Sequence, residues 1–247
     1  MMRNVLIYMR YDGTRYHGWQ VQENAVSVQQ VFQDAIEHVF GTRLPVTGCS
    51  RTDAGVHAMM YACNFRTASA IPCDKIPLAL NANLPDDIGV YACRDVPPDF
   101  HARYSCKAKR YLYRIRNSAL RDPFEMGRAA VVRFPLDENV LHTAAQDFLG
   151  THDFAAFAAA GGSVEDTVRT VTHAAVYRTG ETVCFEVQAD GFLYNMVRIM
   201  TGTLLDIAAG KIDREGIPDI LRSLDRSRAG VTAPPQGLYL KEVFYSL

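Results

Sequence analysis

The order of periodic segments in the first hundred residues constrains the fold of this chain more than any other feature. Apolar, β-branched and aromatic runs predict strands at residues 5–11, 44–49, 57–66 and 88–96. Segments with helical spacing lie between them at residues 27–40 and 74–82. The order β-α-β-β-α-β is that of the ferredoxin-like split unit. It predicts an antiparallel sheet with its helices on one face and the other face free for a partner.

The second half of the chain predicts another mixture of strands and helices. Strands are expected at residues 104–117, 130–134, 167–177, 182–189 and 238–245. Helices are expected after an Asp137 N-cap, over residues 194–209 and after Pro218. The fold class is therefore α+β, and we expect two domains, residues 1–103 and residues 104–247.

The charge of the chain is concentrated in one segment, although its total is close to zero. The 247 residues carry a formal net charge of −1. Residues 103–133 nevertheless contain nine basic residues against two acidic ones. Such a segment suits a polyanionic ligand that binds at one place. A pair of solvated strands that happens to be basic explains the same count equally well.

Cysteine spacing and hydropathy exclude several other classes of protein. The six cysteines form no C-x-x-C pair and have no partnering His-x-x-x-His, so we expect reduced thiols and no metal site. The apolar run near the N-terminus reaches Arg10 too early for a signal peptide. No stretch is long enough to span a bilayer, and we expect a cytoplasmic protein with no membrane association.

The first candidate site is a polar turn between two predicted strands. Residues 48–57 read Gly-Cys-Ser-Arg-Thr-Asp-Ala-Gly-Val-His and place Arg51 two residues before Asp53. Asp-Ala-Gly is also ordinary turn material, because Asp caps backbone amides and Gly accepts positive φ. From these residues alone, a structural turn is the better interpretation.

The second candidate is the strand at residues 107–116. Alternation places Lys107, Lys109, Tyr111 and Tyr113 on one face, with Arg110 and two further arginines on the other. Aromatic rings among cations on a sheet can stack an unpaired base beside phosphate contacts. Tyrosines packed in a core with satisfied hydroxyls give the same pattern.

The third candidate is Arg198, which lies on an otherwise apolar predicted helix. A buried guanidinium without a carboxylate would be destabilised by several kcal/mol. Asp53, Asp206 and Glu186 are the candidate partners. An arginine whose head group reaches solvent is the alternative.

Taken together, these segments resemble the TruA family of tRNA pseudouridine synthases. Five blocks match in order over nearly the whole chain, and a closing Gly-Leu-Tyr-Leu at residues 237–240 agrees as well. The blocks are Tyr-Asp-Gly with Tyr-His-Gly-Trp-Gln (11–13, 16–20), Arg-Thr-Asp-Ala-Gly-Val-His (51–57), Asn-Ala-Asn-Leu-Pro (81–85), Phe-His-Ala-Arg with Lys-Arg-Tyr (100–103, 109–111), and Met-Val-Arg (196–198). Any one block by itself is a weak signal, whereas the block at residues 51–57 together with its correctly spaced neighbours is a strong one.

The resemblance implies a role for each candidate residue. Asp53 would be the catalytic carboxylate, Tyr111 would stack on the target base, and Arg198 would pair with Asp53. Arg51 stands where the family uses a basic residue to help displace the target nucleotide. One departure is Ser50, where the family often has glycine, and it concerns the local turn geometry only.

The resemblance also implies the substrate and the assembly. It implies a pseudouridine synthase fold in which two α+β domains with antiparallel sheets form a central RNA-binding cleft. The substrate would be the anticodon stem-loop of tRNA (tRNA positions 38, 39 and 40), contacted in addition by Lys109, Arg110 and His57. No cofactor and no metal would be needed, and the enzyme would be a homodimer.

Two other functions compete with this interpretation. A non-catalytic RNA-binding protein would explain the basic strand but would leave Asp53 and Arg198 without a role. A hydrolase that releases the base from a nucleoside generally needs a second carboxylate near the first. The Arg-Thr-Asp block contains no second acid.

Overall fold

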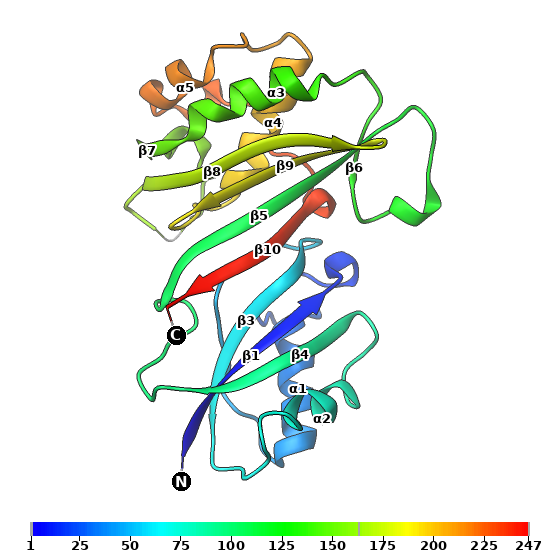
Figure 1. Ribbon diagram of the computed structural model, residues 1–247, viewed down its shortest axis with the longest axis vertical. Helices are drawn as coiled ribbons and strands as arrows, with labels where there is room; N and C mark the ends of the chain where they lie inside the picture. Colours follow the sequence, from blue (N-terminus) through cyan, green and yellow to red (C-terminus); the bar gives the residue numbers. More distant parts are fainter. Residues whose placement is uncertain (1, 163, 247) are drawn as a thin grey trace. The chain divides into compact units, whose positions relative to one another are not determined.

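The computed structural model describes residues 2–162 and 164–246, and these form two compact units (Figure 1). The first unit contains residues 1–107 and 239–247, and the second contains residues 108–238. The expected division into residues 1–103 and 104–247 differs from this at its C-terminal end. The reason is that the last strand, β10 (Leu238–Tyr245), pairs with β3 of the first unit at Tyr239 and Leu240.

The first unit has the predicted β-α-β-β-α-β order. Its elements are β1 (Arg3–Tyr11), α1 (Val28–Phe40), β2 (Thr47–Gly48), β3 (His57–Thr67), α2 (Ile76–Asn81) and β4 (Ile88–Val96). The strand order is β4-β1-β3-β10, and β2 pairs with β3. The pairs among β1 to β4 are antiparallel, and β10 is parallel to β3. The predicted strand at residues 44–49 is reduced to the two residues of β2.

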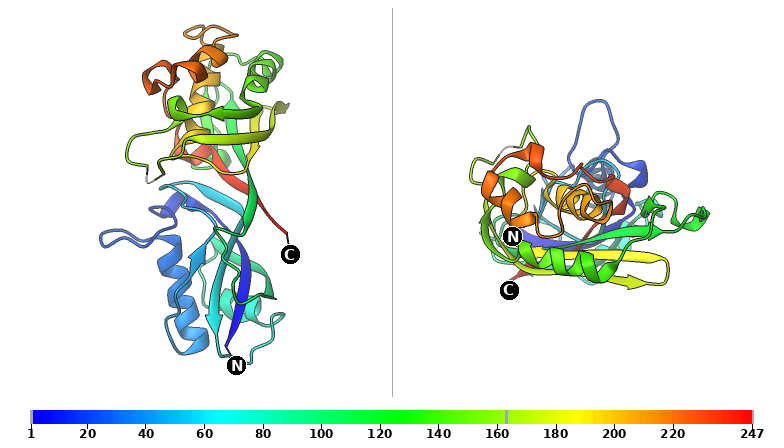
Figure 2. Two further views of the ribbon diagram at one scale, coloured as in Figure 1. Left: turned by 90° about the vertical axis from the view of Figure 1, so that its left-hand side faces the viewer. Right: turned by 90° about the horizontal axis from the view of Figure 1, so that it is seen from above.

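Helix α1 shows how local sequence fixes this unit. Ser27 is the N-cap, and its side chain accepts a hydrogen bond from the Gln30 amide at 3.3 Å, as the capping box predicts. Gly41 ends the helix with a φ of 72°. Val28, Phe32 and Ile36 of the apolar stripe are fully buried. Both α1 and α2 lie on the same face of the sheet, behind β1, β3 and β4 in Figure 1 and beside them in Figure 2.

The second unit is also an α+β structure. Its elements are β5 (Cys106–Asn117), β6 (Ala130–Val132), α3 (Glu138–Ala145), β7 (Gly150–Asp153), β8 (Val168–Thr179), β9 (Thr182–Ala189), α4 (Met196–Ala208) and α5 (Ile217–Ser223). The strand order is β5-β9-β8-β7, with β6 parallel to β5. The predicted fold class is confirmed. Strand β7 was not predicted, because its Gly-Thr-His-Asp sequence has no apolar alternation and only its pairing with β8 identifies it.

The helices of the second unit follow the predicted caps and apolar runs. Asp137 caps α3 by accepting hydrogen bonds from the amides of Asn139 and Val140. Helix α4 is buried over most of its length and packs directly on backbone, since a Cβ added at Gly202 would lie 1.7 Å from the Val231 carbonyl oxygen. Among the described residues, no helix is long and apolar enough to cross a membrane.

Candidate active site

Asp53 lies at the start of a tight turn that precedes β3. Its carbonyl accepts a hydrogen bond from the Val56 amide at 3.1 Å, and Gly55 has a φ of 77°. These values correspond to a type II turn, which favours glycine at its third position. The Asp53 side chain is half-buried and Arg51 is exposed. The residues Asp-Ala-Gly are therefore turn material, as predicted, and the turn presents a carboxylate.

The segment 16–19 holds this turn through backbone hydrogen bonds. The Trp19 amide donates to the Thr52 carbonyl at 3.0 Å, and the Gly55 amide donates to the Tyr16 carbonyl at 3.2 Å. Gly18 has a φ of 81° and lies against the turn without a side chain between them. The turn is therefore bound on both sides of Asp53.

Side chains behind the turn fix its other flank. The Tyr11 and Thr52 hydroxyls are 2.8 Å apart, and the Tyr61 hydroxyl donates to the Ser50 carbonyl. Trp19 stacks on Tyr61 with ring centroids 4.1 Å apart. Burial raises the pKa of Tyr61 well above its usual value, so its hydroxyl stays protonated as a donor. These contacts explain why the aromatic block at residues 16–20 accompanies the Arg-Thr-Asp block.

His57 is another side chain that supports the Asp53 turn from behind. It is only 2% exposed, its Nδ1 accepts the Gly13 amide at 3.0 Å, and its ring stacks on Tyr239 at 4.5 Å. Gly13 itself cannot carry a side chain, because a Cβ there would lie 2.0 Å from the Val56 carbonyl oxygen. These contacts indicate that His57 positions the turn, and the RNA contact expected for it from the sequence stays a prediction.

Asp87, which follows the block at residues 81–85, also supports the Asp53 turn. It was not among the residues predicted from the sequence. The Tyr16 hydroxyl donates to its carboxylate at 2.6 Å, and Arg15 Nε donates at 2.7 Å. The Asp12 amide donates to the Asp87 carbonyl at 2.9 Å. Burial and the Asp87 carboxylate raise the pKa of Tyr16, which keeps this hydroxyl a donor. The Pro-Asp-Asp turn that follows the Asn-Ala-Asn-Leu block was the available signal.

In the second unit, Tyr111 and Tyr113 point to the same face of β5 but differ in surroundings. Tyr111 is 6% exposed and meets Phe192 edge to face, with centroids 5.0 Å apart. Tyr113 is fully buried, and its hydroxyl donates to the Pro234 carbonyl at 2.6 Å. Tyr113 is therefore a core residue with a satisfied hydroxyl. Lys109, two residues before Tyr111 on the same strand, is half-buried.

Arg198 lies in the first turn of α4 with an oriented guanidinium. Its Nε donates to the Ala233 carbonyl at 2.7 Å, and its Nη1 donates to Asn195 Oδ1 at 2.8 Å. Asn195 precedes the helix with a φ of 60°, a conformation that asparagine tolerates better than most residues. Burial raises the pKa of Tyr113, and the positive charge of Arg198 opposes part of that shift. The Arg198 head group thus has a defined direction.

Two of the three carboxylates considered as partners of Arg198 have other cations beside them. Asp206 Oδ1 lies 2.9 Å from Lys211 Nζ. Glu186 Oε1 lies 3.4 Å from His173 Nε2 and 3.7 Å from Arg110 Nε. Arg110 also donates two hydrogen bonds to Gln188 Oε1, at 2.7 and 3.0 Å. The side chain of Arg110 is therefore engaged on its own sheet.

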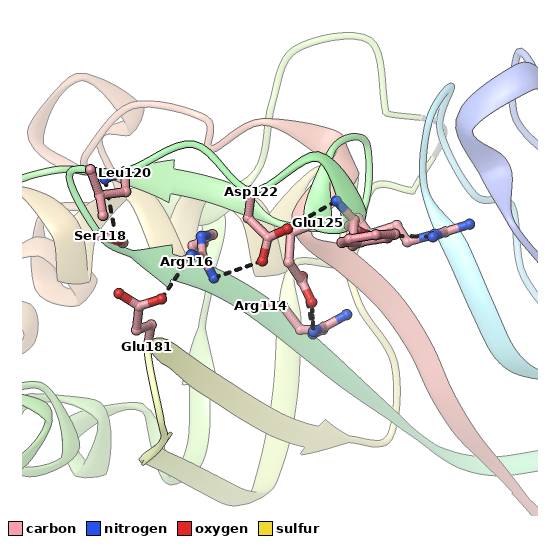
Figure 3. A network of polar contacts seen from close by, with 9 residues as sticks. Arg114, Arg116, Ser118, Leu120, Asp122, Glu125 and Glu181 are labelled. Atoms are coloured by element: carbon pink, nitrogen blue, oxygen red, sulfur yellow. Dashed lines mark hydrogen bonds and ion pairs between the residues drawn. The ribbon is translucent and has the colours of Figure 1, made fainter.

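Part of the predicted basic segment is neutralised by its own acids (Figure 3). Arg114 Nη2 contacts both oxygens of Glu125 at 3.0 Å. Arg116 lies 3.3 Å from Asp122 and 2.7 Å from Glu181. Since both acidic residues of the segment 103–133 pair with its arginines, the charge available for a polyanion is carried by other side chains. Those exposed to solvent are Arg103, Lys107, Arg121, Arg128 and Arg133.

Comparisons with known proteins agree with the resemblance drawn from the sequence blocks. A family model described as tRNA pseudouridine synthase matches residues 7–105 and 144–246. The chain is 49% identical to tRNA pseudouridine synthase A of Thermoanaerobacter sp. (strain X514) over 99% of this chain and 100% of that protein. It is 45% identical to the protein of the same name from Halalkalibacterium halodurans over 96% of this chain and 90% of that protein. The chain therefore belongs to the tRNA pseudouridine synthase family.

Proposed function

We propose that this protein isomerises uridine to pseudouridine in the anticodon stem-loop of tRNA, with Asp53 as its essential carboxylate. The observation that carries the proposal is the turn that presents Asp53. Backbone hydrogen bonds with Tyr16 and Trp19, together with the hydroxyl of Tyr11, hold this turn on a sheet. A catalytic group held by a rigid scaffold loses little entropy when the substrate arrives.

The reaction needs a carboxylate and a means of turning the base. The bond between C1′ of the ribose and N1 of uracil breaks, and a bond between C1′ and C5 forms. The proton on C5 is lost and N1 gains one, so nothing is oxidised and no group leaves the substrate. A carboxylate can act as nucleophile, stabilise positive charge at the sugar, or move a proton. The residues around Asp53 are compatible with each of these three roles for its carboxylate.

Access to the base gives roles to Tyr111 and Arg51. A base in a stem must leave its stack before C1′ and C5 can be reached, and this costs a few kcal/mol. We assign Tyr111 to replace the lost stacking on one side of the base, and exposed Arg51 to help displace the nucleotide. The edge-to-face contact with Phe192 fixes the plane of the Tyr111 ring.

Arg198 is proposed as the partner of the Asp53 carboxylate. Its Nε and Nη1 are tied to Ala233 and Asn195, so its head group has one preferred orientation. The other two candidate carboxylates, Asp206 and Glu186, lie beside Lys211 and beside Arg110 and His173. A guanidinium next to Asp53 would favour its ionised form and fix the direction of its oxygens.

The remaining proposals concern RNA binding and assembly. Exposed arginines and lysines of the segment 103–133, together with Lys109, would contact backbone phosphates and RNA shape. The family resemblance supports a homodimer in which one tRNA contacts both subunits. A concentration series in analytical ultracentrifugation, with and without tRNA, tests the dimer; a monomer at all concentrations would contradict it.

The main experiment follows tritium released to water from tRNA labelled at C5 of uridine. We expect release with the wild-type protein and none with Asp53→Asn, while both bind the tRNA with similar affinity. Binding without release by the wild type, on a range of tRNAs, would favour the non-catalytic RNA-binding protein. Free uracil among the products would favour the hydrolase.

A further inference from the structure

Two cysteine side chains meet at one edge of the first unit. Cys93 lies on β4, opposite Ile7 of β1, and Cys73 lies in the segment that leads into α2. Their Sγ atoms are 3.1 Å apart, and both residues are partly exposed. Cys49, Cys63 and Cys184 are buried by contrast. A bridge between these two thiols would need little movement.

Arg3 and Asp95 hold the sulfur pair in place. Arg3 Nη2 donates to Cys73 Sγ at 3.1 Å, and Nη1 donates to the Ile71 carbonyl at 3.1 Å. Arg3 Nε lies 2.8 Å from the carboxylate of Asp95, which is two residues beyond Cys93 on β4. The guanidinium therefore ties the segment around Cys73 to the strand that carries Cys93. The two thiols are fixed neighbours rather than the ends of two mobile loops.

We propose that Cys73 and Cys93 form a reversible intramolecular disulfide by exchange with a low-molecular-weight disulfide such as glutathione disulfide. The Cys73 sulfur attacks one sulfur of the small disulfide, forms a mixed disulfide and releases one small thiol. The Cys93 sulfur then attacks Cys73 Sγ and releases the second small thiol. The two protein thiols are oxidised, the small disulfide is reduced, and the two thiol protons end on the released thiols.

The surroundings of the two sulfurs decide the order of attack. Burial and the neighbouring Cys73 raise the pKa of Cys93, so Cys93 is the poorer nucleophile toward an external disulfide. Cys73 Sγ lies between the Arg3 guanidinium, whose Nη2 donates to it at 3.1 Å, and the Asp95 carboxylate, to which it donates at 3.7 Å. Because an S–S bond is about 2.05 Å long, the sulfurs must approach by roughly 1 Å. Rotation of the Cys73 and Cys93 side chains in a partly exposed site can bring the two sulfurs together over this distance.

The bridge lies away from the Asp53 turn within the same unit. Cys93 is opposite Ile7, four residues before Tyr11 on β1, and Tyr11 contacts Thr52 beside Asp53. A strand rises about 3.4 Å per residue, so Cys93 and the Tyr11 end of β1 are separated by roughly 14 Å along the strand. We therefore expect oxidation to leave the rate of tRNA isomerisation within twofold, which makes the test of the bridge independent of the proposed function.

The test incubates the native protein with glutathione disulfide, alkylates the remaining thiols and measures intact mass and disulfide-linked peptides. The wild type should lose two alkylatable cysteines, yield a linked peptide containing Cys73 and Cys93, and recover both thiols in reduced glutathione. Cys93→Ser should trap a glutathione adduct on Cys73, and Cys73→Ser should form no bridge. Cys106→Ser, at another partly exposed cysteine, is the matched control and should bridge like the wild type.

Two results would overturn the proposal. One is a wild-type protein that keeps six alkylatable cysteines while a reference dithiol peptide in the same tube is oxidised. The other is an intramolecular bridge that persists in Cys93→Ser, because the bridge would then use a different sulfur. Circular dichroism of each variant before oxidation verifies that the comparison is made between folded proteins.

Discussion

Gly18 and Thr52 are so close that a Cβ added to Gly18 would lie 2.3 Å from the Thr52 carbonyl oxygen. The Thr52 carbonyl oxygen, one residue before Asp53, already accepts a hydrogen bond from the Trp19 amide. The glycine therefore sets how near the segment 16–19 approaches the turn that presents the carboxylate.

Replacing Gly18 with alanine should displace this turn and lower activity. Gly41 offers a matched control, because it also has positive φ, at 72°, but nothing lies within 4 Å of an added Cβ. Gly41→Ala should lower the free energy of unfolding by about 1 kcal/mol from backbone strain alone. Gly18→Ala should lower the free energy of unfolding by more than Gly41→Ala does, and it should reduce kcat at least tenfold in a folded protein. Equal kcat for the two variants would show that the close approach does not matter.

Tyr111 should act through its ring and not through its hydroxyl. Tyr111→Phe keeps the ring and the contact with Phe192, so it should retain much of the activity. Tyr111→Ala should lose most of it, since stacking on an aromatic ring is worth about 1–3 kcal/mol per base. Single-turnover rates with saturating enzyme measure the difference. Similar rates for both variants would contradict the stacking role.

The pairing of Arg198 with Asp53 can be tested by non-additivity. Arg198→Leu should lower the single-turnover rate strongly, and adding Asp53→Asn to it should lower the rate no further than Asp53→Asn alone. Asn195→Ala removes the bond to Nη1 and should have a smaller effect in the same direction. Wild-type turnover from Arg198→Leu would exclude it as the partner of the carboxylate.

Several buried tyrosines should limit stability at high pH. Burial raises the pKa of Tyr16, Tyr61 and Tyr113. A raised folded-state pKa stabilises the fold fully below the unfolded value, near pH 10, and this contribution is lost as pH rises toward the folded-state value. We expect alkaline unfolding to begin above about pH 10. Tyrosinate absorbance and circular dichroism should change together for these residues; ionisation well before loss of structure would contradict this.

Local sequence signals were sufficient for most of the fold. The Ser27 capping box, the Asp137 N-cap and the strand at residues 238–245 are all found as predicted. These features depend on residues within a few positions of one another. The partner of the last strand could not be predicted in the same way, because its pairing with His57 joins residues far apart in the chain.

The candidate site was also predictable only where it depends on residues close together in the sequence. The turn around Asp53 could be identified because its residues are contiguous. The support from Asp87 and the neutralisation of Arg116 by Glu181 depend on long-range contacts that a strand pattern does not contain. The support of His57 also depends on a long-range contact, because its ring packs on Tyr239.

The position of β10 has a consequence for how this protein is made. Residues 1–107 emerge from the ribosome first, but the unit that they form is completed by residues 239–247. During synthesis, the second unit can therefore fold before the first has its last strand, reversing the usual order from the N-terminus onward. Until Tyr239 is added, His57 lacks its stacking partner, so the nascent chain would carry Asp53 on an unfinished support.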